Sequence, residues 1–163
     1  MSRAARQRLL GVATVVLLLA LAAWQWRHDR DTAPGTLLTL TPAAITRIDL
    51  GFAGQPMQHF ARRDDHWWHT DGTPTRADDG WLGELAATAA APVAAWRDAR
   101  DFDPARIGLT PAQATLVLDG HTLAFGAIDA TAPLVYVQSG TRIGWVSLRY
   151  LPRADAGRRL RLH

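Results

Sequence analysis

The chain has 163 residues, a formal net charge of +3 at neutral pH and a hydrophobic share of 48%. This length accommodates one domain and a short appendage. All 18 basic residues are Arg and cysteine is absent, which excludes a P-loop lysine, a Schiff-base lysine, disulfides and a thiolate nucleophile.

Basic residues are unevenly distributed along the chain. Arg3, Arg6 and Arg8 precede an apolar block, and from Trp24 onward the chain carries as many acidic residues as Arg. Nucleic-acid binding depends on a basic surface that displaces counterions, so a balanced domain is a poor candidate for it. We therefore expect no nucleic-acid partner.

Residues 9–24 form an uncharged apolar segment that ends in Trp24. As a helix extended to Trp26 the segment would be about 27 Å long, close to the ~30 Å hydrocarbon core of a bilayer. The pattern predicts a transmembrane anchor over residues 9–26. Trp24 and Trp26 would then lie at the far interface, where amphipathic rings are favoured.

The flanking residues predict an orientation for this anchor. The basic tip, residues 1–8, would stay in the cytoplasm. The remainder would lie in the periplasm, which predicts a single-pass protein of the bacterial inner membrane. A cleaved signal peptide remains the alternative, because residues 20–22 read Ala-Leu-Ala, a small-x-small cleavage pattern. Both alternatives export the same domain.

A short linker, residues 27–35, leads into an expected domain over residues 36–152. Alternating apolar residues predict a first group of strands, and Asp119-Gly120 is a strong hairpin signal within a second group. The second group reads as a four-stranded antiparallel meander. The predicted strands cover residues 36–40, 45–52, 57–62, 66–70, 114–118, 121–126, 134–138 and 142–147.

Between the two groups, Pro74–Ala91 is predicted to be a helix that Thr75 or Asp78 caps and Pro92 ends. A short strand, Val93–Trp96, follows it. The expected fold class is therefore α+β. It has an antiparallel β-sheet in two meander-like groups and one covering helix, preceded by a single N-terminal transmembrane helix and followed by a basic tail over residues 153–163.

The order of these features resembles a bacterial family, the domain of unknown function four-three-four-zero. The resemblance covers about residues 37–151, and Ile107 stands where Phe is commoner in that family. The residues that carry it are Leu38, Ile45 to Leu50, Trp68, Ile107, Gly108, Leu109, Thr110, Pro111, Leu123, Gly126, Tyr136 and Val137.

The resemblance implies an N-terminal membrane anchor and a domain outside the cytoplasm. Some members accompany ABC-transporter components of the gliding-motility auxiliary type. It therefore implies an ABC-transporter permease or auxiliary subunit as the partner. The family has no established catalytic residues, so the resemblance assigns none to this chain.

His66 and His69 are spaced as zinc ligands on a helix would be. The surrounding residues favour a strand instead, on which positions three apart point to opposite faces. We expect no metal site and no cofactor. Trp67 and Trp68 are adjacent on the same predicted strand, so one of them should lie near the surface. These two residues form the candidate partner contact.

Other residues with catalytic potential have ordinary structural explanations. The numerous Asp residues lie in turns or near the helix start, where they bind backbone N–H groups. No Ser has the context of a nucleophile elbow. We therefore expect no enzymatic activity.

The sequence thus predicts a membrane-anchored periplasmic accessory or scaffold protein that contacts other proteins of an envelope complex. A glycan- or peptide-binding module is the alternative, because aromatic residues such as Trp81, Trp96 and Trp145 could form a binding platform. A hydrolase that uses Asp and His is a third alternative.

Overall fold

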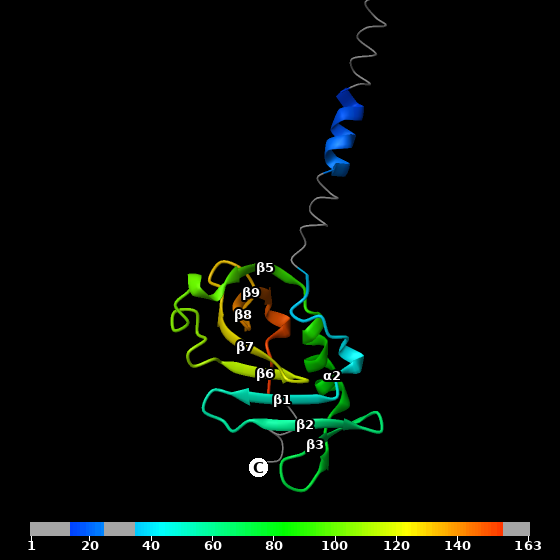
Figure 1. Cartoon of the computed structure of the whole chain (residues 1–163), viewed down its shortest axis with the longest axis vertical. Coiled ribbons are helices and arrows are strands. Elements are labelled where there is room, and N and C mark those ends of the chain that lie inside the picture. The colour runs from blue at the N-terminus through cyan, green and yellow to red at the C-terminus, as the bar shows by residue number, and fades with distance from the viewer. Residues whose placement is uncertain (1–13, 25–34, 155–163) are drawn as a thin grey trace, which may run out of the picture. The chain divides into compact units, whose positions relative to one another are not determined.

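The computed structural model describes residues 14–24 and 35–154 (Figure 1). They belong to two compact units, which divide between Ala33 and Pro34. In the first unit residues 14–24 are helical and their side chains are exposed.

This helix corrects the predicted anchor. Residues 9–13 and 25–26 of the predicted anchor lie outside the described residues. Within the described ranges, no helix combines the length and apolar character that a membrane crossing requires. The predicted transmembrane helix over residues 9–26 is therefore wrong. The predicted single-pass inner-membrane localisation, which depended on that helix, is corrected with it.

Of the five residues expected to mark the membrane interface, the structure describes one, Trp24. Trp24 is the last described residue of the helix and is 64% exposed. The other four interface residues lie outside the described residues: Arg3, Arg6, Arg8 and Trp26.

The second unit is built on one nine-stranded antiparallel sheet with the strand order β4-β3-β2-β1-β6-β7-β8-β9-β5. Figure 1 shows that the sheet is strongly curled between β1 and β5. The strands are β1 (Arg47–Phe52), β2 (Gln58–Arg63), β3 (His66–His69), β4 (Thr75–Arg76), β5 (Val93–Asp98), β6 (Ala114–Leu118), β7 (His121–Ile128), β8 (Leu134–Ser139) and β9 (Arg142–Ser147).

One α-helix, α2 (Asp79–Ala87), accompanies the sheet and continues as the 3-10 helix η2 (Thr88–Ala90). It is shorter than the predicted Pro74–Ala91 because Thr75–Arg76 pairs with β3 as a strand. Asp78 is the N-cap, and its carboxylate accepts the Trp81 backbone N–H. Three further short 3-10 helices occur, namely η1 (Pro42–Ala44), η3 (Ala99–Asp101) and η4 (Leu148–Tyr150).

The predicted fold class, α+β with two meander-like groups, is wrong for this unit, which is predominantly a single β-sheet. The two groups join because β1 pairs with β6, with Ile48 opposite Leu118. Asp119, in the turn after β6, reinforces this pairing by accepting the backbone N–H of Thr46 and Arg47. The predicted strand over residues 36–40 is only an isolated bridge between Thr36 and Pro92.

The hydrophobic core lies between α2 and the inner face of the sheet. Leu82 and Leu85 of α2 are buried there. Alternate residues along the central strands supply the rest of the core, as the period-2 pattern predicts. The fully buried sheet residues of this core are Ile48, Leu50, Leu116, Leu118, Leu123, Phe125, Val135, Val137 and Val146.

The Ile-Gly-Leu motif packs on β7 from the outer face of the sheet. The Ala127 N–H donates to the Ile107 carbonyl over 2.7 Å, and Leu109 is buried. Gly108 has φ +68°, and a Cβ there would lie 2.8 Å from Ala127 N. A Cβ on Gly126 would overlap the Ile107 carbonyl oxygen. Both glycines are therefore needed for this close approach.

The two ends of the sheet are closed in different ways. At the β4 end, next to β3, the Trp67 carbonyl accepts the Ala77 N–H over 2.9 Å, and the Trp67 N–H donates to Asp79. At the other end, β5 is irregular between Val93 and Trp96, and the Val93 N–H donates to Gly35.

Candidate interaction surface

The outer face of β1–β4, opposite the hydrophobic core, carries a cross-strand row of four residues. Arg47 of β1 pairs with Ala61 of β2, Ala61 with Trp68 of β3, and Trp68 with Arg76 of β4. Directly paired residues of an antiparallel sheet point to the same face. Two further pairs flank this row on the same face, namely Asp49 with His59 and Arg63 with His66.

Trp67 and Trp68 separate to opposite faces of β3. Trp67 is 4% exposed and belongs to the core, whereas Trp68 is partly exposed on the outer face. The Arg76 guanidinium lies 5.9 Å from the centre of the Trp68 ring, a cation–π contact. The expectation that one of the pair lies near the surface is therefore confirmed. Of these two candidate contact residues, only Trp68 lies on the outer face.

Asp79 joins the start of α2 to this surface. Its Oδ1 accepts the Trp67 N–H over 2.7 Å, and its Oδ2 lies 2.7 Å from Arg76 and 3.0 Å from His66 Nδ1. The Trp67 N–H, with Arg76 and then His66, holds the pKa of the Asp79 carboxyl well below its usual range. Asp79 thus fixes the position of Arg76 beside Trp68.

His59 occupies the next row of the surface. Its Nδ1 lies 2.9 Å from Asp49 Oδ1, and its backbone N–H donates to Asp71 Oδ2 over 3.0 Å. The hydrogen bond with Asp49, opposed by partial desolvation, raises the pKa of His59. Asp49 and Asp71 attract the imidazolium, while Arg47 repels it and lowers this pKa.

Arg47 and Arg63 differ from the other cations of the surface. Both side chains are exposed, and neither has a hydrogen bond or an ion pair within the part of the chain that the structure describes. By contrast, Arg76 is paired with Asp79 and His59 with Asp49. The two guanidinium groups are therefore free to pair with acidic groups of another molecule.

The outer face of the sheet at β8 and β9 is covered by the chain's own residues. Phe102 packs edge-on against Trp145 at a centroid distance of 5.7 Å, and Tyr136 lies 5.3 Å from Trp145. The Tyr136 hydroxyl donates to Asp129 over 3.4 Å. Tyr136 is thus part of a partly buried aromatic cluster, which sequence reasoning did not recognise because Phe102 comes from a distant connector.

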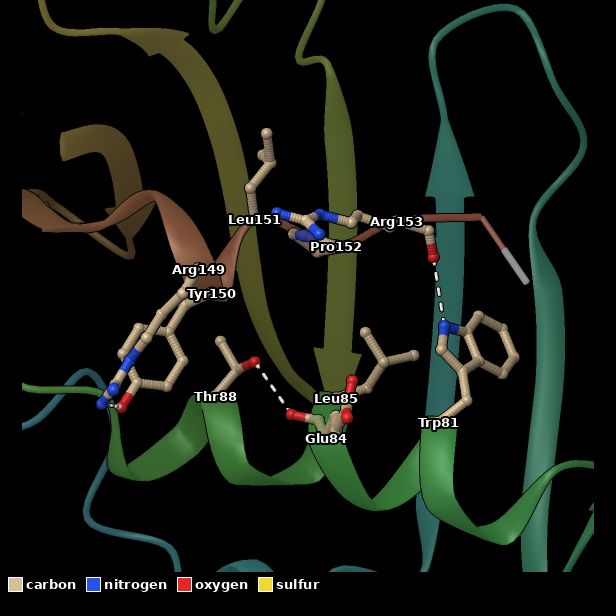
Figure 2. A pocket seen from close by; sticks show the side chains of 9 residues that line it. All are labelled: Trp81, Glu84, Leu85, Thr88, Arg149, Tyr150, Leu151, Pro152 and Arg153. Atoms are coloured by element: carbon tan, nitrogen blue, oxygen red, sulfur yellow. Dashed lines mark hydrogen bonds between the residues drawn. The ribbon is translucent and has the colours of Figure 1, made fainter. Parts of the chain in front are cut away.

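A small cavity lies on the other face, between α2 and the segment after β9 (Figure 2). Its volume is about 80 Å³, well below the ~300–1,000 Å³ of a typical ligand site. The Trp81 indole N–H donates to the Arg153 carbonyl over 3.1 Å and closes one end. Tyr150 and Arg149 stack at the other end, 4.6 Å apart. The cavity is therefore a packing gap between two segments of the chain.

His66 and His69 point to opposite faces of β3, as expected. His66 contacts Asp79, while the His69 ring packs 5.1 Å from Phe60. His69 Nε2 lies 3.3 Å from Asp71 Oδ2 but is buried without a hydrogen bond. Among the residues that the structure describes, no three His, Asp or Glu side chains are grouped to hold a metal ion.

The remaining tryptophans of the predicted platform are dispersed. Trp81 packs edge-on against Phe60 at 5.5 Å on the core side, and Trp96 packs at the β5 end, where Arg142 lies 4.4 Å above its ring. Trp145 belongs to the aromatic cluster. The structure therefore does not bring these rings together with Trp68.

Comparisons of the chain with models of protein families, with curated proteins and with solved structures found no match. The resemblance to the domain of unknown function four-three-four-zero therefore stays a prediction.

Proposed function

We propose that residues 35–154 form a non-enzymatic interaction module, an accessory or scaffold protein that binds another protein through the outer face of β1–β4. The observation that carries this proposal is the outer-face row of Arg47, Ala61, Trp68 and Arg76, in which both Arg residues are exposed and Ala61 and Trp68 are partly exposed. Trp and Arg are the residue types most enriched at energetic centres of protein interfaces. Ala61, which has a small side chain, pairs directly with Trp68 in this row.

The fixed positions of the Trp68 and Arg76 side chains also support a role of this surface in binding a partner. Trp68 lies on a paired strand, and Asp79 fixes Arg76 over its ring. A surface that is held in place before binding loses less conformational freedom when the partner docks. The resemblance implies an ABC-transporter component as this partner, and the purification below is suited to detect one.

The test is affinity purification of the tagged full-length protein from its native host after mild crosslinking. We expect a partner in stoichiometric amount with the wild-type protein. The Trp68→Ala variant should reduce its recovery at least ~10-fold, equivalent to about 1.4 kcal/mol. Ile128→Ala is the matched control, because Ile128 is an exposed apolar residue of β7, outside the β1–β4 face.

Two outcomes would refute the proposal. One is recovery of the wild-type protein without any partner. The other is equal recovery of a partner with Trp68→Ala and wild type, when circular dichroism shows both proteins folded.

A glycan- or peptide-binding module is the second candidate, favoured by the partly exposed Trp68 ring. Sugar binding would require a free ring face, whereas Arg76 already lies over this ring at 5.9 Å. Titration of cell-wall fragments with tryptophan fluorescence as the readout separates the candidates. A saturable change that Trp68→Phe abolishes would favour ligand binding over a protein partner.

A further inference from the structure

We infer that the β1–β4 surface recognises an extended acidic segment of its partner, with carboxylates seated on Arg47 and Arg63. This inference rests on the proposed function, since it names the chemistry that the same surface selects. The inference follows from a difference between the charged side chains of this surface. Three of its Asp side chains have partners within the chain, whereas the Arg47 and Arg63 side chains have none among the described residues.

Three acidic side chains at this surface, Asp49, Asp71 and Asp79, are already bound. Asp49 contacts His59, Asp71 accepts the His59 backbone N–H, and Asp79 binds three donors. A basic partner would therefore have to compete with interactions that exist within the chain. An acidic partner meets Arg47 and Arg63, whose side chains have no such interactions among the described residues.

The sheet register sets the spacing of the two cations. Arg47 pairs with Ala61, and Arg63 is two residues beyond Ala61 on the same face. Diagonal neighbours of this kind are ~7–8 Å apart. Alternate residues of an extended peptide are separated by ~6.8 Å at ~3.4 Å per residue. A segment with acidic residues at alternate positions therefore matches the two Arg residues.

The neighbours of Ala61 define the remainder of the preference. Ala61 pairs with Arg47 on one side and with Trp68 on the other, so the partly exposed Trp68 ring lies in the same cross-strand row as Arg47. An apolar or aromatic side chain near the carboxylates can pack there. Exposed ion pairs contribute modestly when alone, so both the carboxylates and this apolar contact are needed for specific binding.

The same surface is poorly suited to a nucleic-acid strand. A strand carries a negative charge on every nucleotide, and it would pass over Asp49 and Asp79 as well as over the Arg residues. An alternating acidic peptide places charges only at intervals. The geometry therefore favours the peptide.

The test uses the full-length protein and a fluorescently labelled peptide of nine residues, in which glutamate alternates with threonine around a central phenylalanine. A matched peptide has glutamine in place of glutamate. We expect the acidic peptide to bind at least ~10-fold more tightly than the glutamine peptide. Its Kd should rise with salt concentration, because the added ions screen the exposed charges.

The variants Arg47→Gln and Arg63→Gln, combined in one protein, should raise the Kd of the acidic peptide at least ~10-fold. Arg97→Gln is the matched control, because Arg97 is an exposed cation of β5, at the opposite end of the sheet. This control should leave the Kd unchanged. Thermal melts of the wild type, the double variant and the Arg97→Gln control show whether each protein is folded.

Equal binding of the two peptides, equal binding by the double variant, or stronger competition by a single-stranded oligonucleotide of the same charge would overturn the inference. The double variant is also carried through the purification described above. A partner whose recovery depends on Trp68 but is insensitive to the double variant would leave the interaction module standing and remove the acidic preference. Loss of dependence on Trp68 would instead remove the proposed function itself.

Discussion

His59 shows how single residues of the surface are tuned. Its pKa is raised chiefly by the hydrogen bond with Asp49, and Arg47 acts in the opposite direction. We expect Asp49→Asn to lower the pKa of His59 and Arg47→Gln to raise it. Titration of the His59 ring signals by NMR measures both shifts. Shifts of the same sign in the two variants would contradict the geometry described here.

The raised pKa also predicts the pH dependence of stability. Because folding raises the pKa of His59, its pair with Asp49 stabilises the fold fully below the unfolded value of ~6.5. This contribution is lost as the pH rises through the folded pKa. The stability difference between wild type and His59→Gln should therefore shrink above pH ~6.5 in urea denaturation experiments. A difference that grows over this range would refute the assignment.

Two glycines on different elements give substitutions of opposite sign. Gly126→Ala in β7 should destabilise the protein by about 1–3 kcal/mol, because its Cβ would overlap the Ile107 carbonyl oxygen. Gly83→Ala in α2 meets no neighbouring atom and should stabilise it by about 0.5–1 kcal/mol. Urea denaturation measures both. An equal effect of the two substitutions would show that the loop does not pack on β7 as described.

Most individual elements could be predicted from the sequence, but their association could not. Alternation of apolar residues identified β6–β9, and the Asp119-Gly120 signal placed their first turn. The β1–β6 pairing joins residues that are distant in sequence, and no local pattern specifies it. The short strand Thr75–Arg76 was assigned to the helix, because its pairing with β3 is likewise a tertiary contact.

The candidate surface was predictable only in part. Strand periodicity separates Trp67 from Trp68, but it does not say which of them faces the core. That choice depends on the register with β2, which places Trp68 opposite Ala61. The role of Asp79 depends on where α2 begins, and the unpaired state of Arg47 and Arg63 depends on the strand order. The anchor prediction rested on apolar composition over residues 9–26, whereas the described part of the chain holds no helix with the length and hydrophobicity needed to cross a membrane.

For the whole domain, one sheet with one core predicts cooperative unfolding of both groups of strands. Leu116 is fully buried in β6, next to the β1–β6 junction. Leu116→Ala should cost about 2–5 kcal/mol. Hydrogen exchange monitored by mass spectrometry should then show equal loss of protection in β2 and in β8. Loss confined to β6–β9 would indicate two independently folding halves.

The structure of the two edge strands of the sheet affects the tendency of the protein to aggregate. Exposed sheet edges can recruit strands from other molecules and so initiate fibril growth. At one end of the sheet, Asp79 accepts the Trp67 N–H and the Ala77 N–H donates to the Trp67 carbonyl. The last strand there, β4, is only two residues long. At the other end, the irregular β5 carries the exposed Arg97. Both edges therefore disfavour strand pairing between newly synthesised copies of the protein. Specific contacts are then left to the face of the sheet.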